Sequence, residues 1–148
     1  MEYNANNLIL IVEDSPEDYN TTLRAFKKVG MKNKVLRFEM GDDCLDYLYG
    51  RGEFEARNNL YPALIMLDLN LPGTDGREVL KIIKSDQTLK KIPVVVLTTS
   101  NDTGDIEKCY QLGANSYIQK PVSFEGFINA ITTLKEYWFE ISILPRYI

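Results

Sequence analysis

The stretch LIMLDLNLPGTDG, residues 64–76, places a carboxylate, Asp68, directly after an apolar run and before a loop with one proline and two glycines. The run ALIML at 63–67 is continuous rather than alternating, as are LILIV at 8–12 and PVVVL at 93–97. Continuous apolar runs of this length are typical of strands that are covered on both faces and pair in parallel. Open α/β sheets place their functional groups in the loops at the carboxyl ends of such strands. Asp68 is therefore the first candidate for a functional residue.

Helical patterns separate these apolar runs. The first pattern has Ser15 and Pro16 in the order of a helix N-cap and first residue, and it stops at Gly30. The sequence predicts helices at 16–29, 41–50, 74–84, 103–112 and 123 to about 140, with further strands at 34–39 and 116–120. Five such units favour a flavodoxin-like (βα)5 fold, a doubly wound parallel sheet with strand order 2-1-3-4-5. The polar, glycine-rich segment 50–62 is predicted to be a long surface loop.

The composition is that of an ordinary globular protein, with 45% hydrophobic and 26% charged residues among 148. We expect a single domain over residues 1–148. The net charge is −4 and the basic residues are scattered, which argues against nucleic acid as a partner. The run at 8–12 is too short for a membrane span or a signal peptide, so we expect a cytoplasmic protein without membrane contact. Cys44 and Cys109 lie far apart with no histidine nearby, which indicates neither a zinc site nor a disulfide.

Three carboxylates are predicted to meet at one edge of the sheet. Glu13 and Asp14 end the first strand as Asp68 ends the third, and these strands are neighbours in the expected order. Like charges this close repel unless a cation lies among them. Oxygen ligands without histidine or cysteine select a hard cation, and a partly hydrated cluster suits Mg²⁺, with the backbone carbonyl of Asn70 as a further ligand. The alternative is that Glu13 and Asp14 only cap the next helix, where its dipole stabilises carboxylates.

Two more strand ends supply a hydroxyl and a cation. LTTS at 97–100 ends the fourth strand with Thr98, and QKP at 119–121 ends the fifth with Lys120. A threonine and a lysine beside a metal-bound aspartate suit one chemistry, in which the carboxylate is the nucleophile that accepts a phosphoryl group. Mg²⁺ and the ammonium of Lys120 would neutralise the phosphoryl oxygens, and the hydroxyl of Thr98 would donate to one of them.

With these motifs the chain resembles the receiver domain of two-component response regulators, the CheY-like family, over about residues 6–140. The resemblance implies that Asp68 is the phosphoacceptor. It also implies that Glu13, Asp14, Asp68 and the Asn70 carbonyl surround Mg²⁺. Glu13 is one methylene longer than the aspartate that is more frequent at its position, so its reach to the metal is expected to differ.

The resemblance also implies a conformational switch. Thr98 matches the switch hydroxyl, Tyr117 the aromatic switch residue, and Pro121 a cis-prone proline after Lys120. Phosphorylation adds about −1.5 to −2 charges. Thr98 would then move toward the phosphoryl group and Tyr117 would rotate from outside to inside, as a population shift between two states. The alternative is that Tyr117 is only a half-buried strand tyrosine.

A closer likeness is to the small response regulators paired with bacterial phytochromes, chiefly cyanobacterial ones. It rests on LDLNLPGTDGREVL at 67–80, LKKIPVVVLTTS at 89–100, the GRGEFE loop that begins at Gly50, and an aromatic C-terminal segment ending LPRYI. This likeness implies a histidine kinase, such as a phytochrome, as the phosphodonor. The chain has no histidine, so the phosphohistidine donor must be another protein.

The output is expected to pass through protein contacts. Only 28 residues follow Lys120, enough for one helix and a tail but not for an output domain. The segment YWFEISILPRYI at 137–148 continues apolar and aromatic, and exposed patches of that kind mark interfaces. We therefore expect a homodimer through the fourth-helix to fifth-helix face and the tail at 141–148. The candidate interface residues are Tyr137, Trp138, Phe139, Ile141 and Leu144. The alternative is that the tail folds back on its own domain.

Two rival functions remain open. A phosphohydrolase of the haloacid dehalogenase type also uses a strand-end aspartate, but it needs a second acid two residues later, where this chain has Asn70. That difference favours slow loss of the phosphoryl group over turnover catalysis, and Asn70 and Ser100 are expected to tune its lifetime. The other rival is an interaction module that never meets phosphate. A missing Asp68, Thr98 or Lys120 would favour it, and all three are present.

Overall fold

The sheet has five parallel strands in the order β2-β1-β3-β4-β5, as the sequence predicts. The computed structural model describes residues 8–55 and 61–145. The strands are β1 (Ile9–Val12), β2 (Val35–Phe38), β3 (Leu64–Leu67), β4 (Val94–Thr98) and β5 (Ser116–Gln119). The flavodoxin-like fold class is therefore confirmed, with each strand within one or two residues of its expected bounds.

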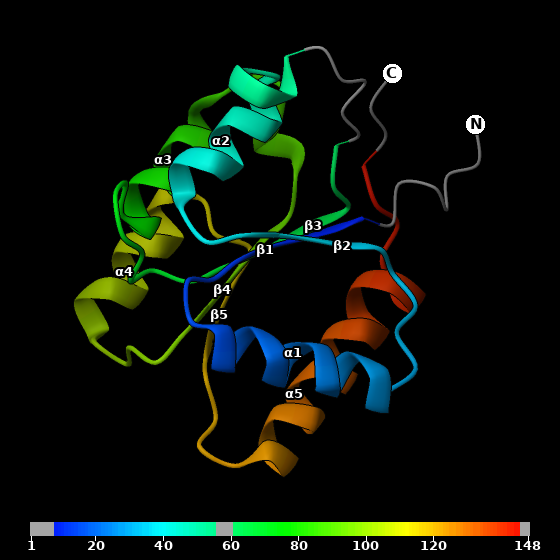
Figure 1. The fold of residues 1–148 in the computed structure, drawn as a ribbon. Coiled ribbons are helices and arrows are strands. Elements are labelled where there is room, and N and C mark those ends of the chain that lie inside the picture. Colours follow the sequence, from blue (N-terminus) through cyan, green and yellow to red (C-terminus); the bar gives the residue numbers. More distant parts are fainter. Residues whose placement is uncertain (1–7, 56–60, 146–148) are drawn as a thin grey trace.

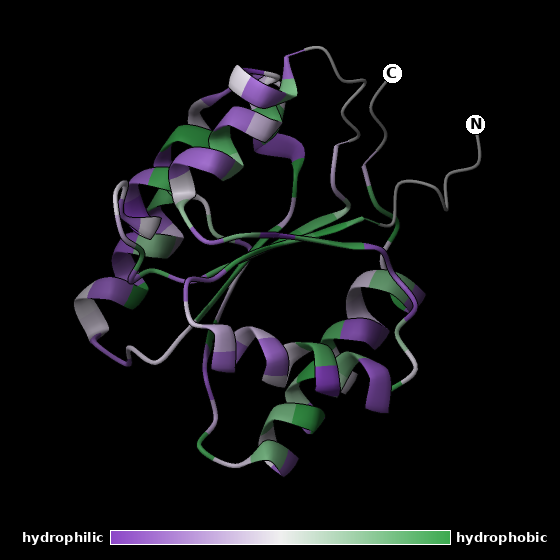
Figure 2. Ribbon diagram, in the orientation of Figure 1, coloured by the Kyte–Doolittle hydropathy of each residue, from purple (hydrophilic) through white to green (hydrophobic). Residues whose placement is uncertain are grey.

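Two layers of helices cover the sheet (Figure 1). One face carries α1 (Pro16–Lys28) and α5 (Phe124–Lys135), and the other carries α2 (Gly41–Tyr49), α3 (Gly76–Ser85) and α4 (Thr103–Leu112). Along β1, Ile9 and Ile11 pack toward the first face while Leu10 and Val12 pack toward the second. This explains why the strand runs are continuously apolar, and Figure 2 shows green strands between helices that each carry green and purple sides.

Side-chain caps start α1, α3 and α5. Ser15 Oγ accepts a hydrogen bond from the backbone N–H of Asp18 at 3.2 Å, and Ser123 Oγ accepts one from Gly126 at 3.0 Å. The Asp75 carboxylate accepts from the backbone of Arg77 at 3.0 Å, so α3 begins two residues later than expected. Such caps satisfy N–H groups that the first helical turn leaves unpaired.

The last predicted helix is not one regular helix. α5 is α-helical to Lys135, and a π-helical turn, η4 (Glu136–Ile141), replaces the expected α-helical end near residue 140. Trp138 and Phe139 pack against the core between the sheet, α1 and α5. These two side chains, which precede the tail at 141–148, therefore fold back on their own domain. Tyr137 and Ile141 are exposed, by 53% and 72%.

The segment predicted as a surface loop, 50–62, is only partly one. Gly50 ends α2 with φ 66°, and a 3-10 turn, η2 (Gly52–Phe54), follows. Phe54 is buried, and its ring lies 5.3 Å from that of Tyr47 and 6.0 Å from that of Phe38, measured between centroids. The loop thus covers the core under α2. Residues 56–60 of the loop, residues 146–148 of the tail, and residues 1–7 lie outside the described part of the chain.

A 3-10 turn, η3 (Leu89–Lys91), links α3 to β4. Cys44 and Cys109 are buried free thiols. In the part of the chain that the structure describes, no helix is both long and apolar enough to cross a membrane.

Candidate functional site

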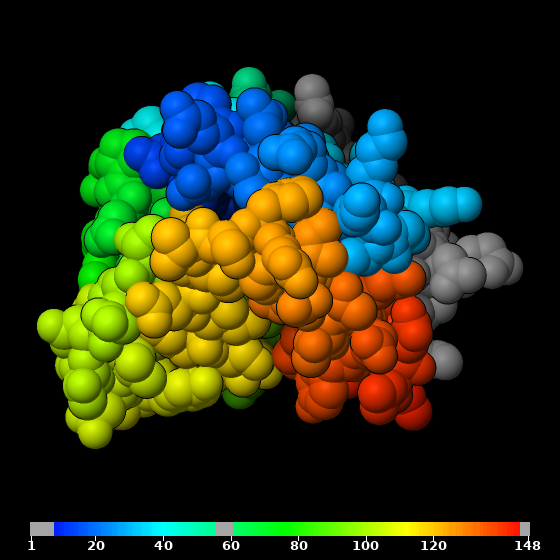
Figure 3. Space-filling view, turned by 90° about the horizontal axis from the view of Figure 1, so that it is seen from below, coloured from blue at the N-terminus to red at the C-terminus, as the bar shows by residue number. Residues whose placement is uncertain are grey.

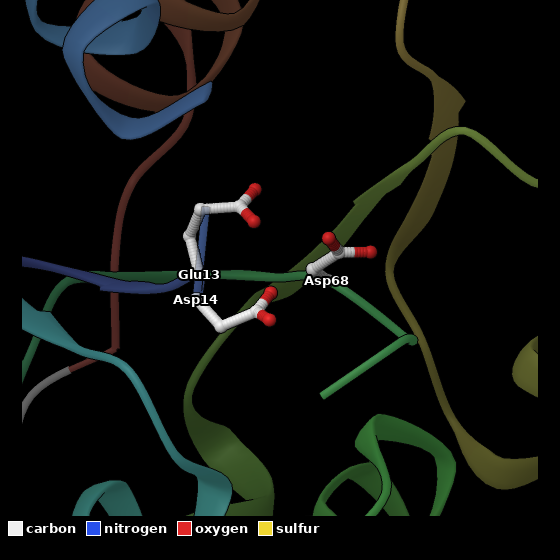
Figure 4. Close-up of side chains that lie close together, drawn as sticks. All are labelled: Glu13, Asp14 and Asp68. Atoms are coloured by element: carbon white, nitrogen blue, oxygen red, sulfur yellow. The ribbon is translucent and has the colours of Figure 1, made fainter. Parts of the chain in front are cut away.

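The three predicted carboxylates meet at the carboxyl ends of β1 and β3. Val12 and Leu67 are partners in the parallel register, and the backbone N–H of Asp68 donates to the Val12 carbonyl at 3.1 Å. This pairing brings Glu13 and Asp14 beside Asp68 (Figure 4). One carboxylate oxygen from each of the three lies within 4.8 Å of the others. Such an oxygen-only set, with Glu13 and Asp68 buried and Asp14 exposed, fits a hard divalent cation.

Lys120 joins the carboxylates from across the sheet. Its Nζ lies 2.6 Å from Glu13 Oε1, 2.8 Å from Asp18 Oδ2 and 3.2 Å from Asp68 Oδ2. The backbone N–H of Lys120 donates to the carbonyl of Thr98 at 2.7 Å, which fixes the lysine beside the end of β4. The ammonium is thus held within hydrogen-bond reach of Asp68.

Burial and charge shift the pKa values of this cluster. Burial alone would lower the pKa of Lys120, but its hydrogen bonds with Asp18 and Glu13 raise that pKa above its usual value, so the ammonium keeps its proton. Burial raises the pKa of Glu13 to about 7, against the opposing hydrogen bond from Lys120. Three carboxylates contact Lys120 and Asp14 lies beside them, so negative charge exceeds positive charge at this edge.

Thr98 and Tyr117 lie on the neighbouring strands. Thr98 ends β4 and is fully buried, and its Oγ1 accepts a long hydrogen bond of 3.5 Å from the backbone N–H of Ser100. Tyr117 is half-buried against the core, and its hydroxyl donates to the Ser100 carbonyl at 2.9 Å. We call this arrangement, with the ring against the core and the hydroxyl on the Ser100 carbonyl, the inside position of Tyr117.

These observations agree with a family-wide comparison. The sequence model of the response regulator receiver domain family matches residues 9–132 of this chain. The chain belongs to the response regulator receiver family. Response regulator Rcp1 of Synechocystis is 38% identical over 97% of each chain. A probable methanogenesis regulatory protein of Methanothrix harundinacea, FilR2, is 40% identical over 88% of this chain and 83% of its own length.

Solved structures of receivers agree with the fold. The Mn²⁺-bound form of Rcp1 is 37% identical and superposes with a TM-score of 0.87, covering 95% of this chain and 99% of that one. The phosphorylated cyanobacterial phytochrome response regulator RcpA is 39% identical with a TM-score of 0.88, at the same coverage. This receiver is thus homologous to phytochrome response regulators, and its acidic pocket is compatible with a divalent cation.

The peptide bond before Pro121, which the resemblance marks as cis-prone, is trans in this structure, and no peptide bond in residues 8–55 and 61–145 is cis. The trans form is the favoured isomer even before proline. Asn70 is exposed, and its backbone N–H lies 3.4 Å from Asp68 Oδ1.

Sequence reasoning missed Asp18 as a site residue of the receiver. Asp18 lies in the first turn of α1. A carboxylate at that position is ordinarily explained by its favourable interaction with the helix dipole. The place of Asp18 in the first turn of the helix that follows β1 was the available signal, because that turn begins two residues after the strand-end pair Glu13 and Asp14.

A cavity of about 470 Å³ also reaches the site. It lies between α1 and the segment before α5, which meet as blue and orange surfaces in Figure 3. Its lining includes Asp18, Arg24, Lys120, Val122 and Phe124. Lys120 can therefore be approached from the α1 side of the receiver.

Proposed function

We propose that this receiver accepts a phosphoryl group on Asp68 in a Mg²⁺-dependent reaction. The observation that carries the proposal is the ammonium of Lys120 at 3.2 Å from Asp68 Oδ2, beside two further carboxylates within 4.8 Å. In the reaction an oxygen of Asp68 attacks phosphorus, and the bond from phosphorus to the donor breaks, so the donor leaves with its electron pair. The product is an acyl phosphate on Asp68.

Each neighbouring residue has a separate part in this reaction. Glu13, Asp14, Asp68 and the backbone carbonyl of Asn70 would hold Mg²⁺, which would neutralise negative charge on the phosphoryl oxygens. Lys120 pairs with another phosphoryl oxygen, and Thr98 donates its hydroxyl to a third. Asn70 and Ser100 flank the acceptor and the switch hydroxyl, where they influence the access of water and thus the lifetime of the acyl phosphate. The side chain at 70 is an amide and not an acid, which supports slow loss rather than turnover.

The donor in this proposal is a histidine kinase. The likeness to Rcp1 and to RcpA, a phytochrome response regulator, favours a phytochrome as that kinase. The signal leaves through protein contacts, because rotation of Tyr117 and movement of Thr98 change the surface formed by α4, β5 and α5.

The test is the intact mass of the protein after incubation with acetyl phosphate. We expect one phosphoryl adduct per chain with Mg²⁺ and none with excess chelator, because Lys120 alone leaves the cluster negative. Peptide mapping is expected to place the adduct in the fragment that contains Asp68. An adduct that forms equally well in chelator would contradict the metal requirement. No adduct together with no Mg²⁺ binding would favour the phosphate-independent interaction module.

The second part of the proposal is a homodimer. Tyr110 on α4, Tyr137 and Ile141 on η4, and Ile143 expose 50%, 53%, 72% and 98% of their surface, which supports an interface along α4, α5 and the following segment. Leu144 is half-buried. We expect a dimeric mass by light scattering at micromolar concentration, and dissociation in Ile141→Ser, because it puts a polar side chain into the apolar patch. A monomeric mass with and without a phosphoryl analogue would exclude the dimer.

A further inference from the structure

A second charged network joins the first turns of α3 and α4. Arg77, in the first turn of α3, forms a bidentate ion pair with Asp105 in the first turn of α4. Its Nε lies 2.8 Å from Asp105 Oδ1, and its Nη2 lies 2.9 Å from Oδ2. Nη1 of the same guanidinium reaches Asp75 at 3.0 Å. The planar guanidinium therefore fixes the start of α4 relative to the start of α3.

Asp105 passes this constraint to the loop after β4. Its Oδ2 accepts a hydrogen bond of 2.8 Å from the hydroxyl of Ser100. The carbonyl of the same serine accepts the hydroxyl of Tyr117 at 2.9 Å, and its N–H donates to Thr98 Oγ1. Ser100 is thus held by its side chain, while its two backbone groups contact the two switch residues.

The other end of the network is fixed to the acceptor loop. Gly76, directly before Arg77, donates its N–H to the Leu69 carbonyl at 2.9 Å. A Cβ atom on Gly76 would lie 2.2 Å from the backbone oxygen of Asp68, so only glycine allows this close approach. Arg77 therefore starts from a position set by the backbone of the phosphoacceptor.

The ion pair between Arg77 and Asp105 contributes more to the position of Ser100 than to the stability of the whole fold. The side chains of Arg77 and Asp105 are 30% and 23% exposed, and ion pairs with this much solvent contact contribute little to global stability. Hydrogen bonds from Arg77 and Ser100 hold the pKa of Asp105 below its usual range, so the carboxylate remains charged at neutral pH.

We propose that Arg77 and Asp105 are positioning residues for the switch. They hold the Ser100 carbonyl where it accepts the Tyr117 hydroxyl, and this favours the conformation with Tyr117 inside before any phosphoryl group is bound. The inference rests on the proposed function, because it assumes that the inside conformation is the one that binds the phosphoryl group. A protein that is competent only in one conformation binds its ligand more weakly when that conformation is less populated. Loss of the network therefore weakens phosphoryl binding without touching the acceptor.

The experiment measures the affinity for beryllofluoride, a phosphoryl analogue, with saturating Mg²⁺ in wild type, Arg77→Gln and Asp105→Asn. We expect each variant to bind about fivefold more weakly. Arg51→Gln is the matched control, because it removes an exposed Arg–Asp pair at 3.2 Å between Arg51, just after α2, and Asp46 on that helix. Its affinity is expected to equal that of wild type.

The same affinity measurement in a Tyr117→Phe parent protein distinguishes a positioning role of Asp105 from a general loss of structure. Tyr117→Phe lacks the hydroxyl that Ser100 accepts, so Asp105→Asn is expected to cause no further loss of affinity there. An equal fivefold loss in both backgrounds would overturn the inference, as would unchanged or tighter binding in the Arg77 and Asp105 variants.

A third measurement keeps the inference apart from the proposed function. Acetylation of Tyr117 by N-acetylimidazole, followed by peptide mass, reports how often its hydroxyl leaves Ser100. We expect faster acetylation in Arg77→Gln and Asp105→Asn than in wild type and Arg51→Gln. If wild type binds no beryllofluoride, the proposed function fails, and the acetylation rates still decide whether the network holds Tyr117. Equal rates in all four proteins would overturn that role.

Discussion

Asp68→Asn is expected to abolish the phosphoryl adduct completely and, at the same time, to make the protein more stable. The amide nitrogen and oxygen of asparagine are poor nucleophiles, so no acyl phosphate forms at the position that faces Lys120. Intact mass after incubation with acetyl phosphate and Mg²⁺ measures the loss. An adduct of normal yield in the variant would show that another residue is the acceptor.

The gain in stability follows from the crowding of carboxylates. Asp68 has two carboxylates within 4.8 Å and one ammonium at 3.2 Å. At an effective dielectric constant of about 20, two repulsions of ~3 kcal/mol each slightly exceed one attraction of ~5 kcal/mol. We therefore expect the free energy of unfolding in chelator to rise by about 1 kcal/mol at pH 8, where Glu13 is mostly charged.

Thermal or urea unfolding without divalent cations measures this gain. Asp43→Asn, at an exposed position on α2, is the control and is expected to change little. Added Mg²⁺ is expected to stabilise wild type more than Asp68→Asn, because the variant has lost one of the carboxylates proposed to bind the ion. A lower stability of Asp68→Asn than of wild type in chelator would contradict this account of the cluster.

Lys120→Met is expected to cause the largest loss of stability. The change keeps most of the side-chain volume but leaves Glu13 and Asp68 buried beside each other without their cation. Removing one partner of a buried ion pair costs about 3 kcal/mol or more. Urea unfolding at pH 8 in chelator measures this cost, and Mg²⁺ is expected to restore part of it. Lys81→Met, at an exposed position on α3, is the control.

The pH dependence of Lys120→Met follows from Glu13. In wild type the pKa of Glu13 is raised from 4.5 to about 7, mainly by burial. The folded protein then binds this proton more tightly than the unfolded chain, so the resulting stability is complete below about pH 4.5 and is lost as pH rises through about 7. Lys120 opposes the shift, so its loss raises the pKa of Glu13 further.

The deficit of the variant is therefore expected to be large at pH 8 and smaller near pH 5.5, where Glu13 is protonated in both proteins. The rate of adduct formation with acetyl phosphate is also expected to fall about a hundredfold, because one cation that neutralises the phosphoryl oxygens is gone. Wild-type stability of Lys120→Met at pH 8 in chelator would contradict the role of Lys120 as the counter-ion.

The strand runs and the strand-end residues could be predicted from sequence because both depend on local pattern. A run such as 93–97 has one stable environment, between two helix layers, and parallel register then brings Asp68 beside Glu13. The exact partner of Lys120 could not be predicted. Asp18 reaches it across 102 residues of sequence, through packing of α1 against the sheet.

The errors have physical causes of the same kind. The end of the last helix was expected to be α-helical, because its apolar spacing fits that form, but its backbone changes to a π-helical turn at Glu136. The apolar residues after α5 were interpreted as one exposed patch, whereas Trp138 and Phe139 find space on the core. The contacts of Arg77 depend on where α4 begins in space, which periodicity does not specify.

The burial of both native thiols makes this receiver suited to single-site labelling. Cys44 is fully buried and its pKa is raised to about 12, and burial also raises the pKa of Cys109. Thiolate is the reactive form, so both cysteines should be nearly inert to maleimide dyes at neutral pH. Ile143 is 98% exposed, and the segment that carries it, red in Figure 1, passes the start of β1, whereas Asp68 follows the carboxyl end of the neighbouring parallel strand β3. A dye on Ile143→Cys would thus report on the proposed subunit contacts from a position remote from Asp68.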